Sequence, residues 1–381
     1  MVTYVAIPFQ AFALTHSSLV VGLISLAEFF PILFIAVIGG AFADAFDRRL
    51  MVRLTECGLA IVSAGLLVNA ALPRPQLFVL FLAATLAAGL DALQRPSLDA
   101  VIPRVVAREQ LAAAAALESL TGSLAHVLGP LVAGVLIATA GLPATFGVDV
   151  GTFALSLVTL SAMRAVPPPE GAQRPSLASV RDGLSFALHR TDLLGTYLVD
   201  VNAMLFGMPI ALFPQIAQRL GGPAVLGLLY AATSFGGLIA ASTSGWAARV
   251  RRQGRAIALA AAVWGVAIVG FGFAQTLWAA LAALAVAGAA DMVSGIFRQA
   301  VWNQTVPDAM RGRLAGVEMI SYTSGPTLGN VEAGVVASLA GVQASIVSGG
   351  VLCVAGTVLL SATMRRFWRY TAQPPAEPAS G

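Results

Sequence analysis

Five ionisable side chains of this sequence lie inside long apolar stretches, where the chemistry open to them is the binding and release of a proton. A charged side chain at the centre of a lipid bilayer is costly unless it lines a water-filled path or meets a partner. A carboxyl group held neutral by desolvation can exchange a proton when its surroundings change, and so can an imidazole. The five residues are Glu28, His126, Asp149, Asp200 and Glu332.

Depth within the apolar stretches separates these candidates. Glu28 and Glu332 lie about 14 Å from the ends of their stretches at 1.5 Å per helical residue, near the middle of a bilayer. Asp149 and Asp200 are shallower, and we expect them to line the same pathway. Ordinary alternatives exist: the His126 ring can simply bind a carbonyl of its own helix, and Glu28 can bond to a neighbouring helix.

The sequence lacks the groups that other chemistries need. All 22 basic residues are Arg, so the phosphate-binding Gly-Lys-Ser/Thr loop of an ATPase cannot occur. His16, His126 and His189 are scattered rather than clustered, and Cys57 and Cys353 have no neighbouring His or acid. We therefore predict no catalytic residue, no metal and no cofactor, with a polytopic membrane enzyme or a channel as the rival classes.

The elements that carry these groups are predicted membrane spans. The chain is 58% hydrophobic and 10% charged, whereas soluble domains are roughly 25% charged. A helix of about 20 residues crosses the hydrocarbon core and satisfies its own backbone there. We predict an all-α membrane protein with twelve spans, near residues 2–14, 19–42, 50–72, 77–94, 111–140, 142–163, 193–217, 225–248, 256–273, 277–297, 314–340 and 346–364.

The predicted spans form two six-helix bundles, residues 1–163 and 192–364. Between them, residues 164–191 form a predicted cytoplasmic linker that includes an amphipathic helix over 176–189. Residues 365–381 form a predicted cytoplasmic tail. The first span is too short to cross a bilayer, so we expect the reading frame to continue upstream of Met1.

The distribution of arginine predicts the orientation of the spans. Twenty of the 22 arginines lie in the linker, in the tail or in connections that follow even-numbered spans. The two exceptions are Arg74 and Arg219. Short arginine-rich connections stay in the cytoplasm, which places the C-terminus there as well. Because the arginines fall in short clusters between apolar stretches, we do not expect nucleic-acid binding.

The two halves repeat one another with an offset of two hundred residues. Glu332 has no acidic counterpart, because Val132 occupies the equivalent position, and this asymmetry favours a function over a scaffold role. Duplicated halves are typical of transporters that bind substrate between the repeats. The matches pair Asp91 with Asp291, Glu118 with Glu318, Gly129 with Gly329, Gly134 with Gly334 and Gly141 with Gly341.

Two acid–base pairs lie near the predicted cytoplasmic ends of the spans. The spacing of Asp91 and Arg95, and that of Asp291 and Arg298, puts each acid and base on one helix face. We expect these pairs to serve gating or structural pairing.

The connection after the second span, residues 39–49, resembles the signature loop of the major facilitator superfamily. Its glycine permits close helix contact, its acid can cap or pair with a helix end, and its arginines hold the cytoplasmic side. A charged turn that only obeys the orientation rule is the simpler alternative. Ala45 and Asp47 depart from the usual pattern. The matching residues are Gly40, Asp44, Arg48 and Arg49.

The fifth span contains a Gly-Pro motif, Gly129, Pro130 and Gly134, that is similar to the motif of antiporters in this superfamily. Small residues on one face allow a partner helix to approach, and proline can bend the span. Helix packing alone explains these residues equally well. Ala125 stands where the motif has a further glycine.

The whole chain resembles the enterobactin exporter group of that superfamily, most clearly at residues 71–75, 167–169, 229–232 and 305–313. The resemblance implies secondary active export of small molecules, siderophores or drug-like compounds, across the bacterial inner membrane by proton antiport and alternating access. A general multidrug or macrolide efflux pump is the alternative that the same group allows. We expect as partners the small-molecule substrate, protons and membrane lipids, and a monomeric protein.

Overall fold

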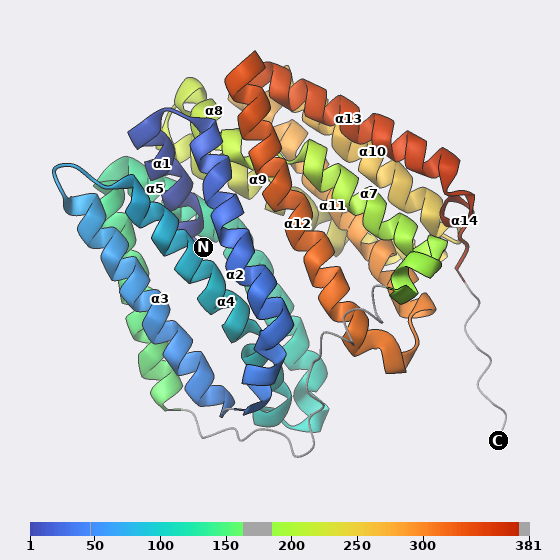
Figure 1. Ribbon diagram of the computed structural model, residues 1–381, viewed down its shortest axis with the longest axis horizontal. Helices are drawn as coiled ribbons and strands as arrows, with labels where there is room; N and C mark the ends of the chain where they lie inside the picture. The colour runs from blue at the N-terminus through green and yellow to red at the C-terminus, as the bar shows by residue number, and fades with distance from the viewer. Residues whose placement is uncertain (46, 163–184, 373–381) are drawn as a thin grey trace.

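A computed structural model describes residues 1–45, 47–162 and 185–372, and every regular element in these ranges is a helix. Figure 1 shows the helices as two bundles joined side by side. The first bundle contains α1 (Val2–Thr15), α2 (Ser18–Ala45), α3 (Arg48–Ala71), α4 (Leu77–Val105), η1 (Arg108–Gln110) and α5 (Leu111–Ser161). The second contains α7 (Thr191–Gly207), η2 (Ile210–Leu212), α8 (Phe213–Leu220), α9 (Pro223–Ser242), η3 (Ser244–Arg249), α10 (Gln253–Gly272), α11 (Leu277–Thr305), α12 (Asp308–Ala340), α13 (Val342–Thr363) and α14 (Arg365–Trp368).

Apolar helices of membrane-spanning length confirm the predicted class, an all-α multi-pass membrane protein. Within the described ranges, nine candidates are long and apolar enough to cross a bilayer. One of the nine, α5, holds two of the predicted spans in 51 residues. α1 has 14 residues and is shorter than a span, and α12 is a 33-residue helix outside the nine. The count of twelve therefore stays a prediction.

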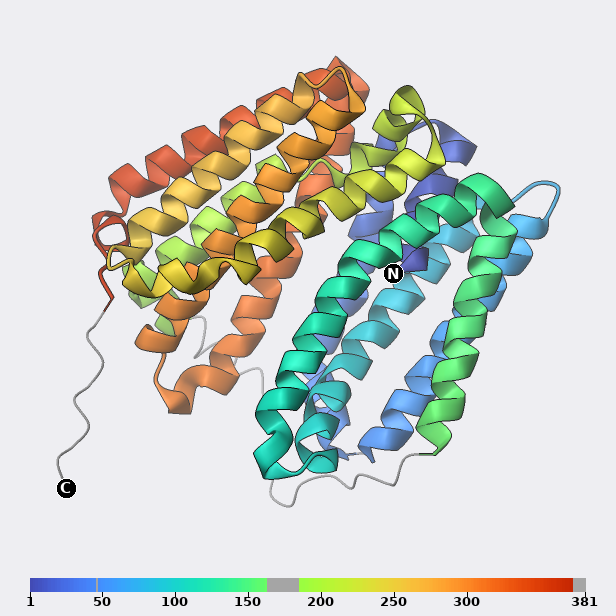
Figure 2. The same ribbon diagram turned by 180° about the vertical axis from the view of Figure 1, so that it is seen from behind.

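The same backbone turn occurs in both halves, two hundred residues apart. Gly141 has φ 76° and ψ 175°, and Gly341 has φ 91° and ψ 160°. A side chain at positive φ would be strained, so glycine suits both positions. At Gly141 the long helix α5 turns back on itself, as Figure 2 shows from behind, and at Gly341 the chain passes from α12 to α13. The repeat seen in the sequence thus has a counterpart in the backbone.

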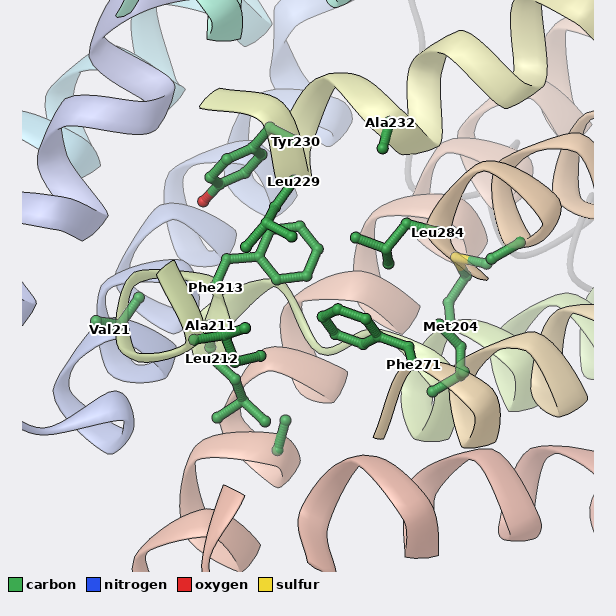
Figure 3. Packing of buried hydrophobic residues seen from close by; sticks show 14 of the residues in the cluster. Val21, Met204, Ala211, Leu212, Phe213, Leu229, Tyr230, Ala232, Phe271 and Leu284 are labelled. Carbon is green, nitrogen blue, oxygen red and sulfur yellow. The ribbon is translucent and has the colours of Figure 1, made fainter. Parts of the chain in front are cut away.

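The predicted span at 193–217 is broken, and the break places an aromatic side chain in the interior of the second bundle. α7 ends at Gly207, η2 spans Ile210–Leu212 and α8 follows. Pro209 lacks an N–H and its ring disfavours a continuous helix, which accounts for the interruption. Figure 3 shows the result: Phe213 packs between Tyr230 and Phe271, with ring centroids 5.2 Å and 5.9 Å apart.

The two bundles contact each other mainly through α2 with α12 and α5 with α9. The close approaches lie at one end of these helices: Gly22 meets the backbone of Asn330, and Gly134 meets that of Gly227. We call this end, with Ser18, Gly22, Gly134, Gly227 and Asn330, the closed end. In Figures 1 and 2 the bundles diverge from it toward the other end.

The opposite end, which we call the arginine end, carries Arg49, Arg190 and Arg365. Residues 115–122 of α5 are exposed without interruption for more than two helical turns. No face of that stretch is covered, whereas Ala133 and Ile137 further along α5 are 0% and 7% exposed. The bundles are therefore packed together at the closed end and apart at the arginine end.

Several predictions fall outside the described residues. Most of the linker and of the predicted amphipathic helix does, because description resumes at residue 185, where residues 185–189 are helical. The backbone at Gly40 and Asp44 belongs to α2, but their side chains are outside the described set. The final nine residues of the tail are outside it too.

Candidate functional site

Glu28 and Glu332 are half-buried carboxylates without a cationic partner among the described residues. Glu28 lies on α2 within electrostatic range of Asp91 and of the hydroxyl of Tyr4. The ring of Tyr4, from the first bundle, meets the ring of Tyr230, from the second, edge to face at 5.4 Å. Glu28 therefore lies beside the boundary between the two bundles.

Asp149 is buried and satisfied by two hydroxyl groups. Thr3 Oγ1 donates to Asp149 Oδ2 at 2.5 Å, and Ser63 Oγ donates to the same oxygen at 2.6 Å. Three helices, α1, α3 and α5, thereby converge on one carboxylate inside the first bundle.

Asp200 is buried on α7 and forms an ion pair with Arg298 of α11. Arg298 also lies 3.5 Å from Asp291, the acid with which its sequence spacing pairs it. Glu318 of α12 interacts electrostatically with the same guanidinium and with Tyr197. One arginine thus serves three acids from three helices, a cluster that sequence spacing within α11 alone did not reveal.

The remaining ionisable candidates behave differently. His126 is exposed, and its Nδ1 lies 3.1 Å from the carbonyl oxygen of Gly122 on its own helix. Asp91 and Arg95 are both exposed and interact electrostatically, but no ion pair within 4.0 Å forms between them in the described structure. The acids Asp91 and Asp291 are equivalent in the repeat, but their pairing with arginine differs in geometry.

Asn330 joins three elements at the closed end, and the sequence analysis missed it. Its Nδ2 donates to Ser25 Oγ of α2 at 3.1 Å, and its Oδ1 accepts from the backbone N–H of Ala211 in η2 at 3.1 Å. The N–H of Ala211 is available because α7 ends at Gly207, so no carbonyl of a continuous helix accepts from it. A second polar bridge between the bundles runs from Ser18 Oγ to Gln215 Oε1, 2.8 Å. The available signal was an amide two residues before Glu332 in a predicted span.

Small residues let the backbones approach in matching ways in the two halves. A Cβ at Gly134 would lie 2.9 Å from the Cα of Gly227, and one at Gly334 would lie 2.8 Å from the Cα of Leu19. Both are contacts with the other bundle. Atoms of real side chains are not found so close, so these positions require glycine unless the helices move apart.

The protein matches the family model described as "Transmembrane secretion effector" over residues 1–378. It belongs to this family of major facilitator transporters. Similar curated proteins include the enterobactin exporter EntS of Escherichia coli O6:K15:H31 strain 536, 31% identical over 383 residues that cover 99% of this chain and 91% of that protein. The EntS protein of Shigella flexneri is 32% identical, with 99% and 90% covered.

Solved structures with the same fold include the nucleoside transporter NupG, with a TM-score of 0.71 and 12% identity over 97% of this chain and 98% of that one. A bacterial homologue of the iron transporter ferroportin, in an inward-facing state, has a TM-score of 0.71 and 16% identity, with 96% and 95% covered. At these identities the likeness establishes the fold alone. This transporter therefore has the major facilitator architecture expected from its sequence.

The connection between α2 and α3, which resembles the signature loop, makes two contacts that its departures from the usual pattern left open. Asp47 caps the start of α3, where its Oδ1 accepts from the N–H of Leu50 at 3.0 Å. Arg49 donates to the carbonyl oxygens of Leu160 and Ser161 at 3.2 Å and 2.6 Å. These carbonyl groups lie at the C-terminal end of α5 and lack helical hydrogen-bond donors. The arginine supplies the donors, and its positive charge interacts favourably with the negative end of the helix dipole.

Proposed function

We propose that this transporter exports enterobactin, or a chemically similar siderophore, from the bacterial cytoplasm across the inner membrane. The substrate class is carried over from the named relatives, at 31% identity over 99% of the chain. The direction rests on one observation: the bundles are in contact at the end away from the arginine clusters. By the rule that arginine-rich connections stay in the cytoplasm, this conformation is open toward the cytoplasm and can load substrate there.

The proposed driving force is proton entry from the periplasm through Glu28 and Glu332. Among the five ionisable candidates, Asp149 has hydroxyl donors and Asp200 has a guanidinium partner. Glu28 and Glu332 have neither among the described residues. A carboxylate without a partner inside the bilayer is costly, and proton binding removes that cost. Alternating access then carries protons inward and substrate outward.

The coupling is tested with Glu332→Gln and Glu28→Gln in proteoliposomes under an imposed pH gradient. We expect at least one variant to lose gradient-driven enterobactin accumulation while it retains enterobactin binding and substrate–substrate exchange, which needs no net proton movement. Glu109→Gln is the matched control, because Glu109 is an exposed carboxylate in η1. Undiminished gradient-driven transport in both span variants would exclude these two acids as the coupling groups.

The substrate is tested separately in a host whose own enterobactin exporter has been removed. Expression of this chain should restore enterobactin in the medium. Raised macrolide tolerance without restored secretion would contradict the siderophore proposal and favour the general efflux alternative, whatever the result for the two glutamates.

A further inference from the structure

The segment after α13 is held against the second bundle by a buried aromatic ring. Phe367 of α14 is 1% exposed, and its Cγ occupies the space beside Gly195 of α7, 2.5 Å from where a Cβ would be. The backbone N–H of Ala372 donates to the carbonyl oxygen of Arg251 at 2.7 Å. The guanidinium of Arg255 lies over the ring of Trp368, 5.3 Å from its centroid. The segment is thus docked on the ends of α7 and α10.

This docking gathers cations around a pocket of about 410 Å³ at the arginine end. One wall is the start of α7 and the residues before it, and the other is α14 with the two residues that follow. Its lining includes His189, Arg190, Arg365, Arg366, Arg369 and Tyr370.

The pocket carries positive charge that its own acid does not neutralise. Asp192, which also lines it, is already engaged by Arg190 through two hydrogen bonds of 2.7 Å and 3.0 Å. This pairing raises the pKa of the Arg190 guanidinium. Arg365, Arg366 and Arg369 are exposed and have no carboxylate partner within the described residues. Like charges so placed repel, and a bound anion would relieve that repulsion.

The surroundings of the pocket favour a phosphate that belongs to a lipid. Guanidinium groups bind phosphate oxygens in a bidentate geometry, which suits several arginines around one anion. The last turns of α13, directly before Arg365, carry Val358 and Leu359, which are 61% and 63% exposed. Leu188, beside His189, is 54% exposed. The acyl chains of a lipid could therefore pack against these exposed apolar side chains, one or two helical turns from the cationic pocket.

We propose that the pocket lined by Arg365, Arg366 and Arg369 binds the phosphate of an anionic phospholipid headgroup at the membrane surface. The bound lipid would connect the segment after α13 to the start of α7, and so couple the second bundle to the charge of the surrounding leaflet. This site is separate from the span acids and does not depend on the identity of the transported substrate.

The test measures lipid binding to the full-length chain in detergent by native mass spectrometry, with dioleoyl phosphatidylglycerol and dioleoyl phosphatidylcholine as probes. The combined variant Arg365→Gln, Arg366→Gln and Arg369→Gln should bind phosphatidylglycerol about a hundredfold more weakly, at about 1 kcal/mol for each arginine. The matched control carries Arg53→Gln, Arg249→Gln and Arg252→Gln, three exposed arginines whose replacement removes the same charge outside the pocket. Its affinity should be unchanged.

Lysine replacements at 365, 366 and 369 provide a second variant that keeps the charge, and they should retain part of the affinity because bidentate geometry alone is lost. Equal affinity of the native chain for the two lipids would overturn the proposal, as would an equal loss in the control. Competition by inorganic phosphate at the same concentration as phosphatidylglycerol would also overturn it, because the ligand would then be free phosphate. Loss of phosphatidylglycerol binding confined to the pocket variant would support it.

Discussion

At the scale of single residues, the described partners divide the buried acids into two kinds. Asp149 and Asp200 are held by donors from other helices, Thr3 and Ser63 for the first and Arg298 for the second. Glu28 and Glu332 are not. An acid with fixed partners ties several helices together, whereas we propose that an acid without them exchanges a proton during transport. This difference directs the coupling experiments to the glutamates.

The ion pair of Asp200 and Arg298 should stabilise the fold far more than the pair of Asp192 and Arg190. The side chains of the first pair are 7% and 23% exposed, and those of the second are 18% and 41% exposed. Asp200→Asn removes the negative charge that pairs with the mostly buried guanidinium of Arg298. This loss should lower the free energy of unfolding by about 3 kcal/mol. Asp192→Asn should cost less than about 1 kcal/mol.

Denaturation of both variants in the same detergent checks this difference. The substitution is chemically identical at the two positions, so each serves as the control for the other. Similar losses of stability would mean that Asp291 and Glu318 already compensate Arg298 fully.

At the scale of helices, glycine decides how closely the two bundles meet. Gly134 and Gly334 occupy equivalent positions of the repeat and face the other bundle in both cases. Gly129 and Gly329 are also equivalent, and they face α1 and α7, the first helix of their own halves. In each half, one helix, α5 or α12, therefore uses one glycine to contact the other bundle and a second glycine to contact the start of its own half.

Gly134→Ala should shift the transporter away from the conformation closed at this end. The added methyl group meets the Gly227 backbone, and overpacking of about 2 kcal/mol corresponds to roughly thirtyfold in the ratio of the two states. The reporter is Val21→Cys, 3% exposed in the contact between the bundles, in a background of Cys57→Ser and Cys353→Ala. An impermeant maleimide added on the side of the membrane that the closed end faces should label it faster.

Gly122→Ala provides the control on the same helix, because a Cβ there meets no atom within 4 Å. Gly122→Ala stabilises the helical conformation by the same amount as Gly134→Ala, up to about 1 kcal/mol. It should not accelerate labelling of Cys at position 21. Faster labelling in both variants would assign the effect to helix propensity rather than to the contact.

At the scale of the whole molecule, the repeat predicts how the second conformation is built. α5 and α9 run antiparallel and meet at Gly134 and Gly227. About four turns further toward the arginine end, on roughly the same faces, stand Ser119 and Ser242, which are both exposed. When the closed end opens, we expect these two positions to approach one another.

Two double-cysteine variants in the cysteine-free background test this movement. Ser18→Cys with Gln215→Cys replaces a bridge of the closed end and should cross-link readily at rest and block export reversibly. Ser119→Cys with Ser242→Cys should cross-link slowly at rest and faster under substrate and a proton gradient. Equally fast cross-linking of both pairs at rest would contradict two alternating conformations.

The sequence by itself determined the membrane environment, the repeat and the family, because these depend on composition and on spacing along one helix. The arginine clusters, the matching glycines of the two halves and the presence of acids inside apolar stretches all belong to this local information.

Only the tertiary structure decided which acids are paired, where the bundles meet and what the chain after α13 does. The partners of Asp149 and Asp200, the bridge at Asn330 and the arginine pocket each join residues from helices far apart in sequence. Helical periodicity predicts which side chains share a face, but it does not state which helix covers that face. That choice follows from packing of the whole chain, and so does the difference between acids that have described partners and acids that do not.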